Sequence, residues 1–214
     1  MTLRGVFLAD GPSDLPLANH LTRLCADVGL DIALTSLNPH ELPGAVRRTV
    51  EHRLRFVRAQ GASTDLIFVH RDAEGQHPDL RRIEIRDGVA KSGIEDPFVP
   101  VVPVRMTEAW LLLDESAIRE VAGRPHGRTA LKLPNARAVE AIADPKELLR
   151  YALVTASETS GRRRDNFKRD FDRHRRLLLD RLDADGPVSQ LGAWKRLRTD
   201  IAEVARQLQD GRTP

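Results

Sequence analysis

Residues 4–11 have the sequence RGVFLADG, a short apolar run that ends in an acid and a glycine. A run of this length with turn residues at its end is typical of a buried strand. In the next stretch, residues 14–28, apolar side chains recur at a helical spacing, and Gly29 is a natural stop for a helix. A strand followed by an amphipathic helix predicts the first half of a β-α-β unit.

The same alternation continues to residue 121. We expect further strands over residues 31–37, 66–69 and 98–104, and helices over residues 42–60, 80–91 and 107–121. The prolines of the fourth apolar run favour an edge or a strand end over the centre of a sheet. The order β-α-β-α-β-α-β predicts an α/β fold in which a parallel sheet of about four strands has helices on both faces.

The pattern changes after Gly123. Residues 124–137 have a loop-like composition, and no strong strand follows them. Helices are expected over residues 145–158, 166–182 and 188–208. The sequence therefore predicts an α/β domain over residues 1–123 and a mostly helical C-terminal region over residues 124–214 that packs against it.

The composition of the 214-residue chain is ordinary for a globular protein, with 41% hydrophobic and 30% charged residues. No apolar run approaches the roughly 20 residues of a membrane span. The first residues lack the long apolar region of a signal peptide, so we expect a cytoplasmic protein without a membrane partner. The single cysteine, Cys25, excludes a disulfide framework and a multi-cysteine zinc site, and its apolar surroundings predict core packing.

Acidic residues follow the predicted strands. Asp10 ends the first, Asp72 and Glu74 follow the third, and Glu108 opens the helix after the fourth. The carboxyl ends of parallel strands share one edge of a sheet, so these carboxylates are expected to converge. Oxygen ligands without His or Cys favour Mg²⁺ or Mn²⁺ over zinc. Such an ion polarises a phosphate or activates a water to attack one.

Turn chemistry alone also places Asp at strand ends and helix starts. Asp14 fits a helix cap as well as a ligand. Glu108 fits a favourable interaction with the helix dipole as well as a catalytic role. A receiver domain is also α/β with acids at strand ends, but it needs adjacent acids after the first strand, and Asp10 and Asp14 are not adjacent.

Residues 162–176, RRRDNFKRDFDRHRR, carry eight Lys/Arg and three Asp, a local charge of +5 in a chain of net charge +3. Two interpretations stay open: a solvated helical face with i,i+4 ion pairs, or a surface that contacts phosphates. Arg162, Arg163 and Arg164 are expected to form an exposed, mobile stretch. Aromatic residues make up only 4%, which argues against a base-stacking platform for single strands.

Several of these residues resemble a known pattern. Asp10, Gly11 and Asp14 after the first strand, with Asp72 and Glu74 after the third, resemble the Toprim fold of topoisomerases, primases and overcoming-lysogenization-defect nucleases. Residues 103–114, PVRMTEAWLLLD, resemble a block in a Toprim-like family that includes the smaller component of AbiL-type abortive-infection systems. Further similar features span most of the chain, at residues 133–134, 144–146, 162–167 and 191–197.

The resemblance implies a Mg²⁺-dependent enzyme of nucleic acids in phage defence, paired with a separately encoded ATPase. It places Asp10 where Toprim domains have a glutamate that serves as metal ligand or general acid/base. It places Asp72 at the first acid of the metal motif and Glu74 at the second, normally an aspartate. Asp10 is one methylene shorter and Glu74 one longer than the family's residues, which implies either a shifted ion or the loss of cleavage.

Together these observations define the candidate site. The predicted metal ligands are Asp10, Asp14, Asp72 and Glu74. The predicted catalytic residues are Asp10, Glu108 as an additional acid, and Arg105, which would stabilise a phosphate. The predicted nucleic-acid contacts are Arg162, Arg163, Arg164 and Lys168.

Three functions stay open at this point. The first is a metal-dependent endonuclease. The second is a non-catalytic Toprim-like protein that docks on an ATPase or on a second copy of the chain, with Trp110 and Trp194 as anchors unless the core buries them. The third is the hydrolysis of phosphate from nucleotides.

Overall fold

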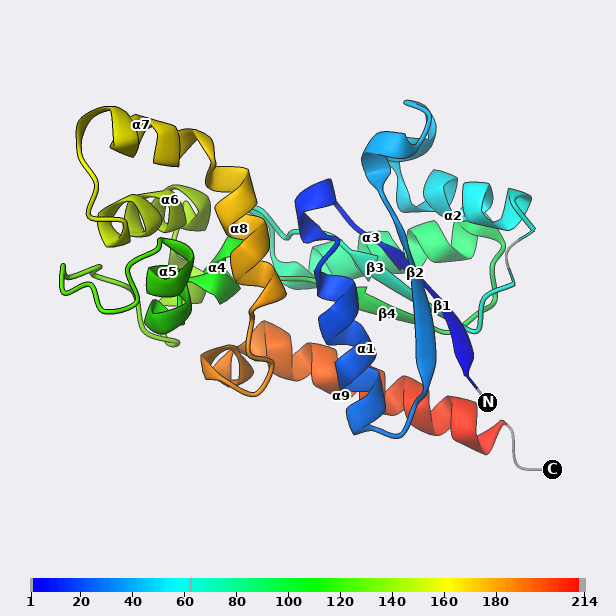
Figure 1. The fold of residues 1–214 in the computed structure, drawn as a ribbon. Helices are drawn as coiled ribbons and strands as arrows, with labels where there is room; N and C mark the ends of the chain where they lie inside the picture. Colours follow the sequence, from blue (N-terminus) through cyan, green and yellow to red (C-terminus); the bar gives the residue numbers. More distant parts are fainter. Residues whose placement is uncertain (1, 62, 212–214) are drawn as a thin grey trace.

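Four parallel strands form the sheet, in the order β2-β1-β3-β4 (Figure 1). The computed structural model describes residues 2–61 and 63–211. The strands are β1 (Leu3–Leu8), β2 (Ile32–Leu37), β3 (Leu66–His70) and β4 (Phe98–Val101). The predicted α/β fold with a parallel four-stranded sheet is confirmed, and the proline-containing β4 lies at an edge of the sheet, as expected.

The helices cover both faces of the sheet and extend to one side of it (Figure 1). They are α1 (Leu17–Asp27), α2 (Val50–Ala59), α3 (Pro78–Ser92), α4 (Glu108–Leu111), α5 (Glu115–Val121), α6 (Pro145–Ala156), α7 (Gly161–Arg169), α8 (Phe171–Asp180) and α9 (Gly192–Asp210). Short 3-10 turns lie at η1 (Pro12–Asp14), η2 (Pro39–Glu41), η3 (Val46–Arg48), η4 (Val139–Ala141) and η5 (Pro187–Gln190).

Alternate residues of the strands point into two cores. Phe7 and Phe68 pack with α1, α9 and the other C-terminal helices. Val6 and Ile67 point to the opposite face and pack with α2 and α3. Successive side chains of a strand point to opposite faces, so the central strands β1 and β3 are apolar on both sides.

Two predicted helices are shorter than expected. The helix expected over 42–60 begins only at Val50, because Pro43 interrupts the stretch and the Thr49 side chain caps α2 by accepting a hydrogen bond from the His52 N–H at 3.2 Å. The helix expected over 107–121 is divided into α4 and α5. Asp114 caps α5 by accepting from the Ala117 N–H at 2.9 Å, which starts a new helix there.

The basic segment is helical from its beginning. Arg162, Arg163 and Arg164 lie in the first turn of α7 and are exposed, so the expectation of a mobile stretch is replaced by a helix. The helix expected over 166–182 is interrupted at Asp170, so its residues belong to two helices, α7 and α8.

The C-terminal helices share a core with the sheet. One cluster of buried side chains contains Leu3 of β1, Trp110 of α4, Leu149 of α6 and Trp194 of α9. The two tryptophan rings meet edge to face, 5.0 Å apart and at 88°. Residue 123 therefore marks a change from strands to helices and does not separate two cores. Because both tryptophans are buried, neither serves as an exposed docking anchor.

Two other sequence expectations have a structural outcome. In the described ranges, no helix is both long and apolar enough to cross a bilayer. Burial raises the pKa of the Cys25 thiol to about 12, so this residue packs as an inert side chain, as predicted. Met1, which begins the stretch without a signal-peptide pattern, lies outside the described residues.

Gly88 allows the close approach of α2 and α3. A Cβ at this position would lie 2.7 Å from the Val50 Cβ and 3.3 Å from the Glu51 backbone nitrogen. We predict that Gly88→Ala lowers the free energy of unfolding by about 1–2 kcal/mol, because the overpacking outweighs the better helix propensity of alanine. Gly44→Ala is the control, since nothing lies within 4 Å of the place that its new Cβ would take. Equal unfolding midpoints in urea for the two variants would contradict this packing.

Candidate functional site

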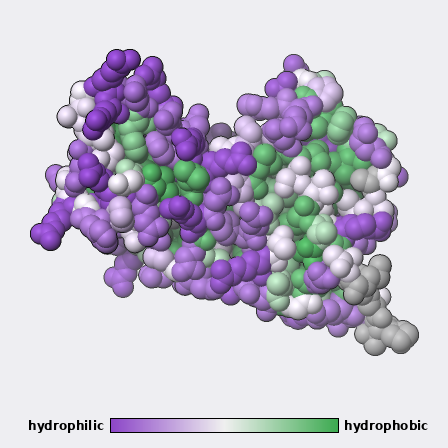
Figure 2. Space-filling view, viewed as in Figure 1, coloured by the Kyte–Doolittle hydropathy of each residue, from purple (hydrophilic) through white to green (hydrophobic). Residues whose placement is uncertain are grey.

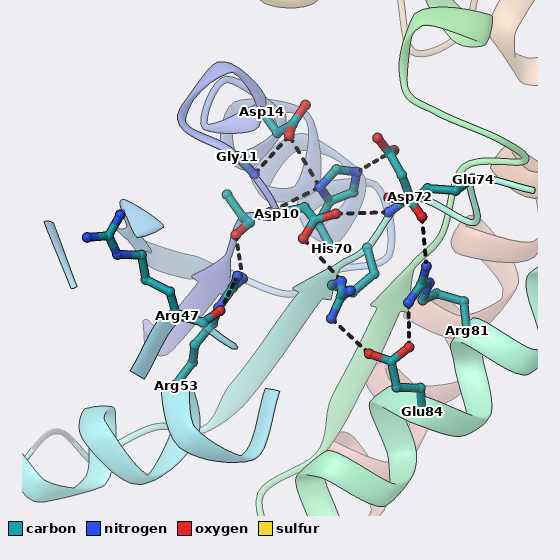
Figure 3. A network of polar contacts seen from close by, with 12 residues as sticks. Asp10, Gly11, Asp14, Arg47, Arg53, His70, Asp72, Glu74, Arg81 and Glu84 are labelled. Atoms are coloured by element: carbon teal, nitrogen blue, oxygen red, sulfur yellow. Dashed lines mark hydrogen bonds and ion pairs between the residues drawn. The ribbon is translucent and has the colours of Figure 1, made fainter. Parts of the chain in front are cut away.

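Asp10 and Asp72 meet at the carboxyl edge of the sheet (Figure 3). Asp10 follows β1 and Asp72 follows β3, which are neighbours in the sheet. The Asp72 N–H donates to Asp10 Oδ2 at 3.4 Å. Asp72 Oδ1 accepts from the backbone N–H and the hydroxyl of Thr107, at 3.1 and 3.3 Å. The topology thus brings these two predicted acids together, as the strand order required.

A fully buried histidine lies at the centre of the acids. His70, the last residue of β3, has 0% exposure. Its Nε2 lies 3.5 Å from Asp72 Oδ1 and 3.1 Å from Thr107 Oγ1. Its Nδ1 lies 3.7 Å from Asp14 Oδ2 and 3.3 Å from the Asp10 backbone nitrogen. Three of the predicted acids therefore surround one imidazole ring (Figure 3).

The surrounding carboxylates favour the charged form of His70. Burial alone would lower the pKa of His70, but Asp14, Asp72 and Asp10 together raise it above its ordinary value. The Nδ1 atom faces both a donor, the Asp10 N–H, and an acceptor, the Asp14 carboxylate. The Asp10 N–H favours an unprotonated Nδ1, which can accept its hydrogen bond. The carboxylates outweigh this single donor and favour the protonated ring, because they act on it from both of its nitrogens.

A buried arginine joins two other predicted acids. Arg175 of α8 reaches Asp14 Oδ1 at 2.6 Å through Nη2 and Glu108 Oε1 at 2.8 Å through Nε. Its Nη1 donates to the Ser13 carbonyl at 2.9 Å. The side chains of Arg175, Asp14 and Glu108 are 4%, 6% and 4% exposed. This placement favours a structural role for Glu108 over that of an additional catalytic acid.

The same contacts decide the state of Asp14. Burial alone would raise the pKa of Asp14, but His70 and Arg175 lower it below its ordinary value, with help from the Gly11 N–H. Burial would lower the pKa of Arg175, but Asp14 and Glu108 raise it. Asp14 also does not cap α1, which begins at Leu17. The oxygens of Asp14 already serve three partners, which favours a structural role for this residue over that of a metal ligand.

A chain of alternating charges joins Asp10 to Glu74. Asp10 Oδ1 lies 3.1 Å from Arg71 Nε, and Arg71 Nη1 lies 2.8 Å from Glu84 Oε1. The other oxygen of Glu84 lies 2.5 Å from Arg81 Nη1, and Arg81 Nη2 lies 3.5 Å from Glu74 Oε2. Glu74 is therefore brought near the other acids, with its carboxylate directed toward Arg81 (Figure 3).

Two loops at this edge hold unusual backbone conformations. Glu74 and Arg105 have φ values of 53° and 63°, in the left-handed region that non-glycine residues rarely adopt. The Glu74 N–H donates to the Arg105 carbonyl at 2.6 Å and ties the loop after β3 to the loop after β4. Such strain is commonly stored where side chains must be held in a set direction. Arg105, half-buried, thus lies beside the acids.

The donor chemistry of Asp10, Asp72 and Glu74 fits a hard divalent cation. Their present arrangement is not preorganised for one: among the described residues, no group of three or more His, Cys, Asp or Glu could hold a metal ion as it stands. The carboxylates of Asp10 and Glu74 are instead matched by arginines, and Asp72 by His70. These three residues would hold a cation only after exchanging these partners.

The predicted nucleic-acid contacts lie on a separate surface. Residues 162–164 and Lys168 are exposed on α7, and no contact joins them to the acids in the described structure. Figure 2 shows a hydrophilic dip in the outline between α7 and the segment that contains η2 and η3. On the η3 side of this dip, Arg47 is exposed and its carbonyl accepts from Arg53, which also donates to the Ala9 carbonyl at 2.9 Å. Basic side chains thus stand on both sides of the sheet edge.

Five residues of the site had no role predicted from the sequence: His70, Arg71, Arg81, Glu84 and Arg175. One signal was present for His70, since it ends the otherwise apolar run Leu66–His70. Another was present for Arg175, which shares a helical face with the buried Phe171 and Leu178. Arg81 and Glu84 are an i,i+3 pair on α3, a spacing that the sequence shows, but their contacts with Glu74 and Arg71 arise only in the folded structure.

The chain has no significant match among protein-family models, curated proteins or solved structures. The class is therefore set by the fold and the site alone: an α/β protein with a cluster of acids at the carboxyl edge of a parallel sheet.

Arg175 carries the first prediction from this site. Arg175→Met leaves Asp14 and Glu108 buried without their cation, so we expect the free energy of unfolding to fall by about 3–5 kcal/mol. Arg176→Met is the matched control, because Arg176 is exposed. Chemical unfolding measures both. In the Arg175→Met background, adding Asp14→Asn and Glu108→Gln should restore part of the loss; no recovery would contradict the ion-pair origin of the effect.

His70 carries the second. Because the folded pKa of His70 is raised above 6.5, its stabilising contribution is complete below that pH and is lost as the pH rises through the folded value. The free energy of unfolding of the wild type should therefore fall as the pH rises above 6.5, and His70→Gln should be less stable at pH 6 with a flatter profile. His40→Gln, at an exposed position, should keep the wild-type slope. Parallel profiles for all three proteins would refute a charged His70.

Proposed function

We propose that this protein is a Toprim-type nuclease that hydrolyses phosphodiester bonds of nucleic acids with Mg²⁺ or Mn²⁺. The observation that carries the proposal is the meeting of Asp10 and Asp72 at the carboxyl edge of two neighbouring parallel strands, with Glu74 beside them. Ligands of α/β proteins bind at this edge of the sheet. The three carboxylates offer the oxygen donors that these cations prefer.

Each residue of the site has a separate task in this proposal. Asp10, Asp72 and Glu74 would hold the cation, which when bound polarises the phosphodiester and activates a water. Thr107 and His70 orient Asp72 through its Oδ1. The backbone contact with Glu74 ties Arg105 to the loop that carries this acid, and its guanidinium would stabilise a phosphate there.

Nucleic acid would lie in the dip between α7 and η3 (Figure 2). Arg162, Arg163, Arg164 and Lys168 offer four exposed cations to one side of a phosphate backbone. Contacts of this kind do not read base sequence, and they weaken steeply with salt. The proposal therefore includes sequence-independent, salt-sensitive binding. A role in phage defence rests on the resemblance alone.

A second candidate function is supported by the pairing of the acids. Since Asp10 and Glu74 already have arginine partners, the chain satisfies its site without a cation. This favours a non-catalytic protein, and its docking on a separately encoded ATPase rests on the resemblance alone. Trp110 and Trp194 are buried, so docking would use the exposed surface of the helical region. Capture of the neighbouring gene product, with no metal-dependent cleavage, would select this candidate.

Asp72 provides the direct test of the nuclease. We expect purified protein to cleave plasmid DNA or single-stranded RNA in Mg²⁺ or Mn²⁺ and not in EDTA. Asp72→Asn should lower the rate by about a hundredfold, because it removes a charged ligand of the cation that acts on the phosphodiester. Asp79→Asn is the matched control, since Asp79 is exposed on α3. Cleavage by Asp72→Asn at the wild-type rate would end this proposal, and turnover of nucleotides only would make the substrate a small phosphate.

A further inference from the structure

Two arginines at the site share one counterion. Arg71, on the turn after β3, and Arg81, on α3, each bind a different oxygen of Glu84, at 2.8 and 2.5 Å. Both contacts are hydrogen bonds. Glu84 therefore fixes the two guanidinium groups side by side at the edge where Asp10 and Glu74 lie (Figure 3).

The links from these arginines to the acids are weaker. Arg71 Nε lies 3.1 Å from Asp10, and Arg81 Nη2 lies 3.5 Å from Glu74, yet neither contact has the geometry of a hydrogen bond. The Glu74 side chain is 66% exposed. Breaking the links to the acids is thus easier than breaking those to Glu84, so Asp10 and Glu74 can leave while the arginines stay in place.

Both arginines also have a buried nitrogen that makes no hydrogen bond. The Nε atoms of Arg71 and Arg81 lack a hydrogen-bond partner among the described residues, and the Arg71 Nε has only its ion pair with Asp10, at 3.1 Å. The Arg81 side chain is only 7% exposed. A guanidinium carries five donors in a planar fork that matches the oxygens of a phosphate. Each guanidinium is therefore hydrogen-bonded to Glu84 through Nη1 and makes no hydrogen bond through Nε, as expected for a group that receives an anion.

We propose that Arg71 and Arg81 are the phosphate-binding pair of this site, and that they exchange the carboxylates of Asp10 and Glu74 for the oxygens of a nucleic-acid phosphate. This inference rests on the proposed function. A cation that draws Asp10 and Glu74 toward itself frees both arginines, and the phosphate that it binds brings the anion that they need. Arg71 and Arg81 thus neutralise Asp10 and Glu74 until the metal and the phosphate bind.

The exchange predicts two shifts of opposite sign for one substitution. In Arg81→Gln, Glu74 loses its competitor, so the affinity for Mn²⁺ measured by calorimetry should rise by about tenfold. The same variant loses a phosphate contact, so its affinity for a short, non-cleavable labelled DNA duplex at saturating Mn²⁺, measured by anisotropy, should fall by about tenfold. A merely structural role would move both affinities in the same direction. Arg71→Gln should reproduce both shifts.

Two variants control for charge and folding. Arg82→Gln removes the same charge from the next position of α3, where Arg82 pairs with Asp200 at 2.7 Å, and it should change neither affinity by more than about twofold. Arg81→Lys keeps the charge and should bind Mn²⁺ as the wild type does. Thermal unfolding of every variant shows that the comparison is between folded proteins.

The outcomes separate this inference from the proposed function. If the wild type binds Mn²⁺ and DNA and Arg81→Gln shifts neither, the arginine pair is refuted and the nuclease stands. If the wild type does not bind Mn²⁺ but Arg81→Gln does, the pair is supported and hydrolysis by the unaided chain is refuted. If no protein of the series binds Mn²⁺, both proposals fail.

Discussion

The buried ion pairs of Arg175 connect helix α8 of the C-terminal region to the acid-bearing edge of the sheet. Arg175 belongs to α8, far along the chain, and its partners Asp14 and Glu108 lie in η1 and α4 of the sheet-bearing part. Desolvating three charges is costly, so the arrangement is stable only because each group has a partner at hydrogen-bond distance. Through Asp14 the pairs reach His70, and through His70 they reach Asp72. The position of the acids at the sheet edge thus depends on a helix of the C-terminal region.

Charge balance is the second constraint on the site. Acids that converge at one edge repel each other unless cations lie between them. In this chain the cations are two arginines and a histidine. Arg71 pairs with Asp10, Arg81 with Glu74, and His70 with Asp72. The acids of this edge are therefore held by internal ion pairs, and binding of a divalent cation would be an exchange of partners. The same property explains why the site is consistent both with a nuclease and with a docking protein.

The sequence predicted the elements that depend on local pattern and strand order. The four strands, the parallel sheet and the meeting of Asp10 with Asp72 follow from apolar runs and from the edge that parallel strands share. It did not predict the late start of α2 or the break at Asp114, because caps compete there with helical periodicity. It could not assign Glu108 to Arg175, since 67 residues separate them and charge on a helix gives no sign of burial.

We propose that Asp10, Asp72 and Glu74 form a cation site in which Arg71 and Arg81 pair with the acids until a cation displaces them. Anomalous diffraction from crystals grown with Mn²⁺ and a short non-cleavable oligonucleotide would show whether this is so. We expect a manganese peak bound by these three carboxylates, with Arg71 and Arg81 turned to a phosphate and still held by Glu84. Bound oligonucleotide with no manganese at this edge, and with the Asp10–Arg71 and Glu74–Arg81 pairs intact, would contradict it.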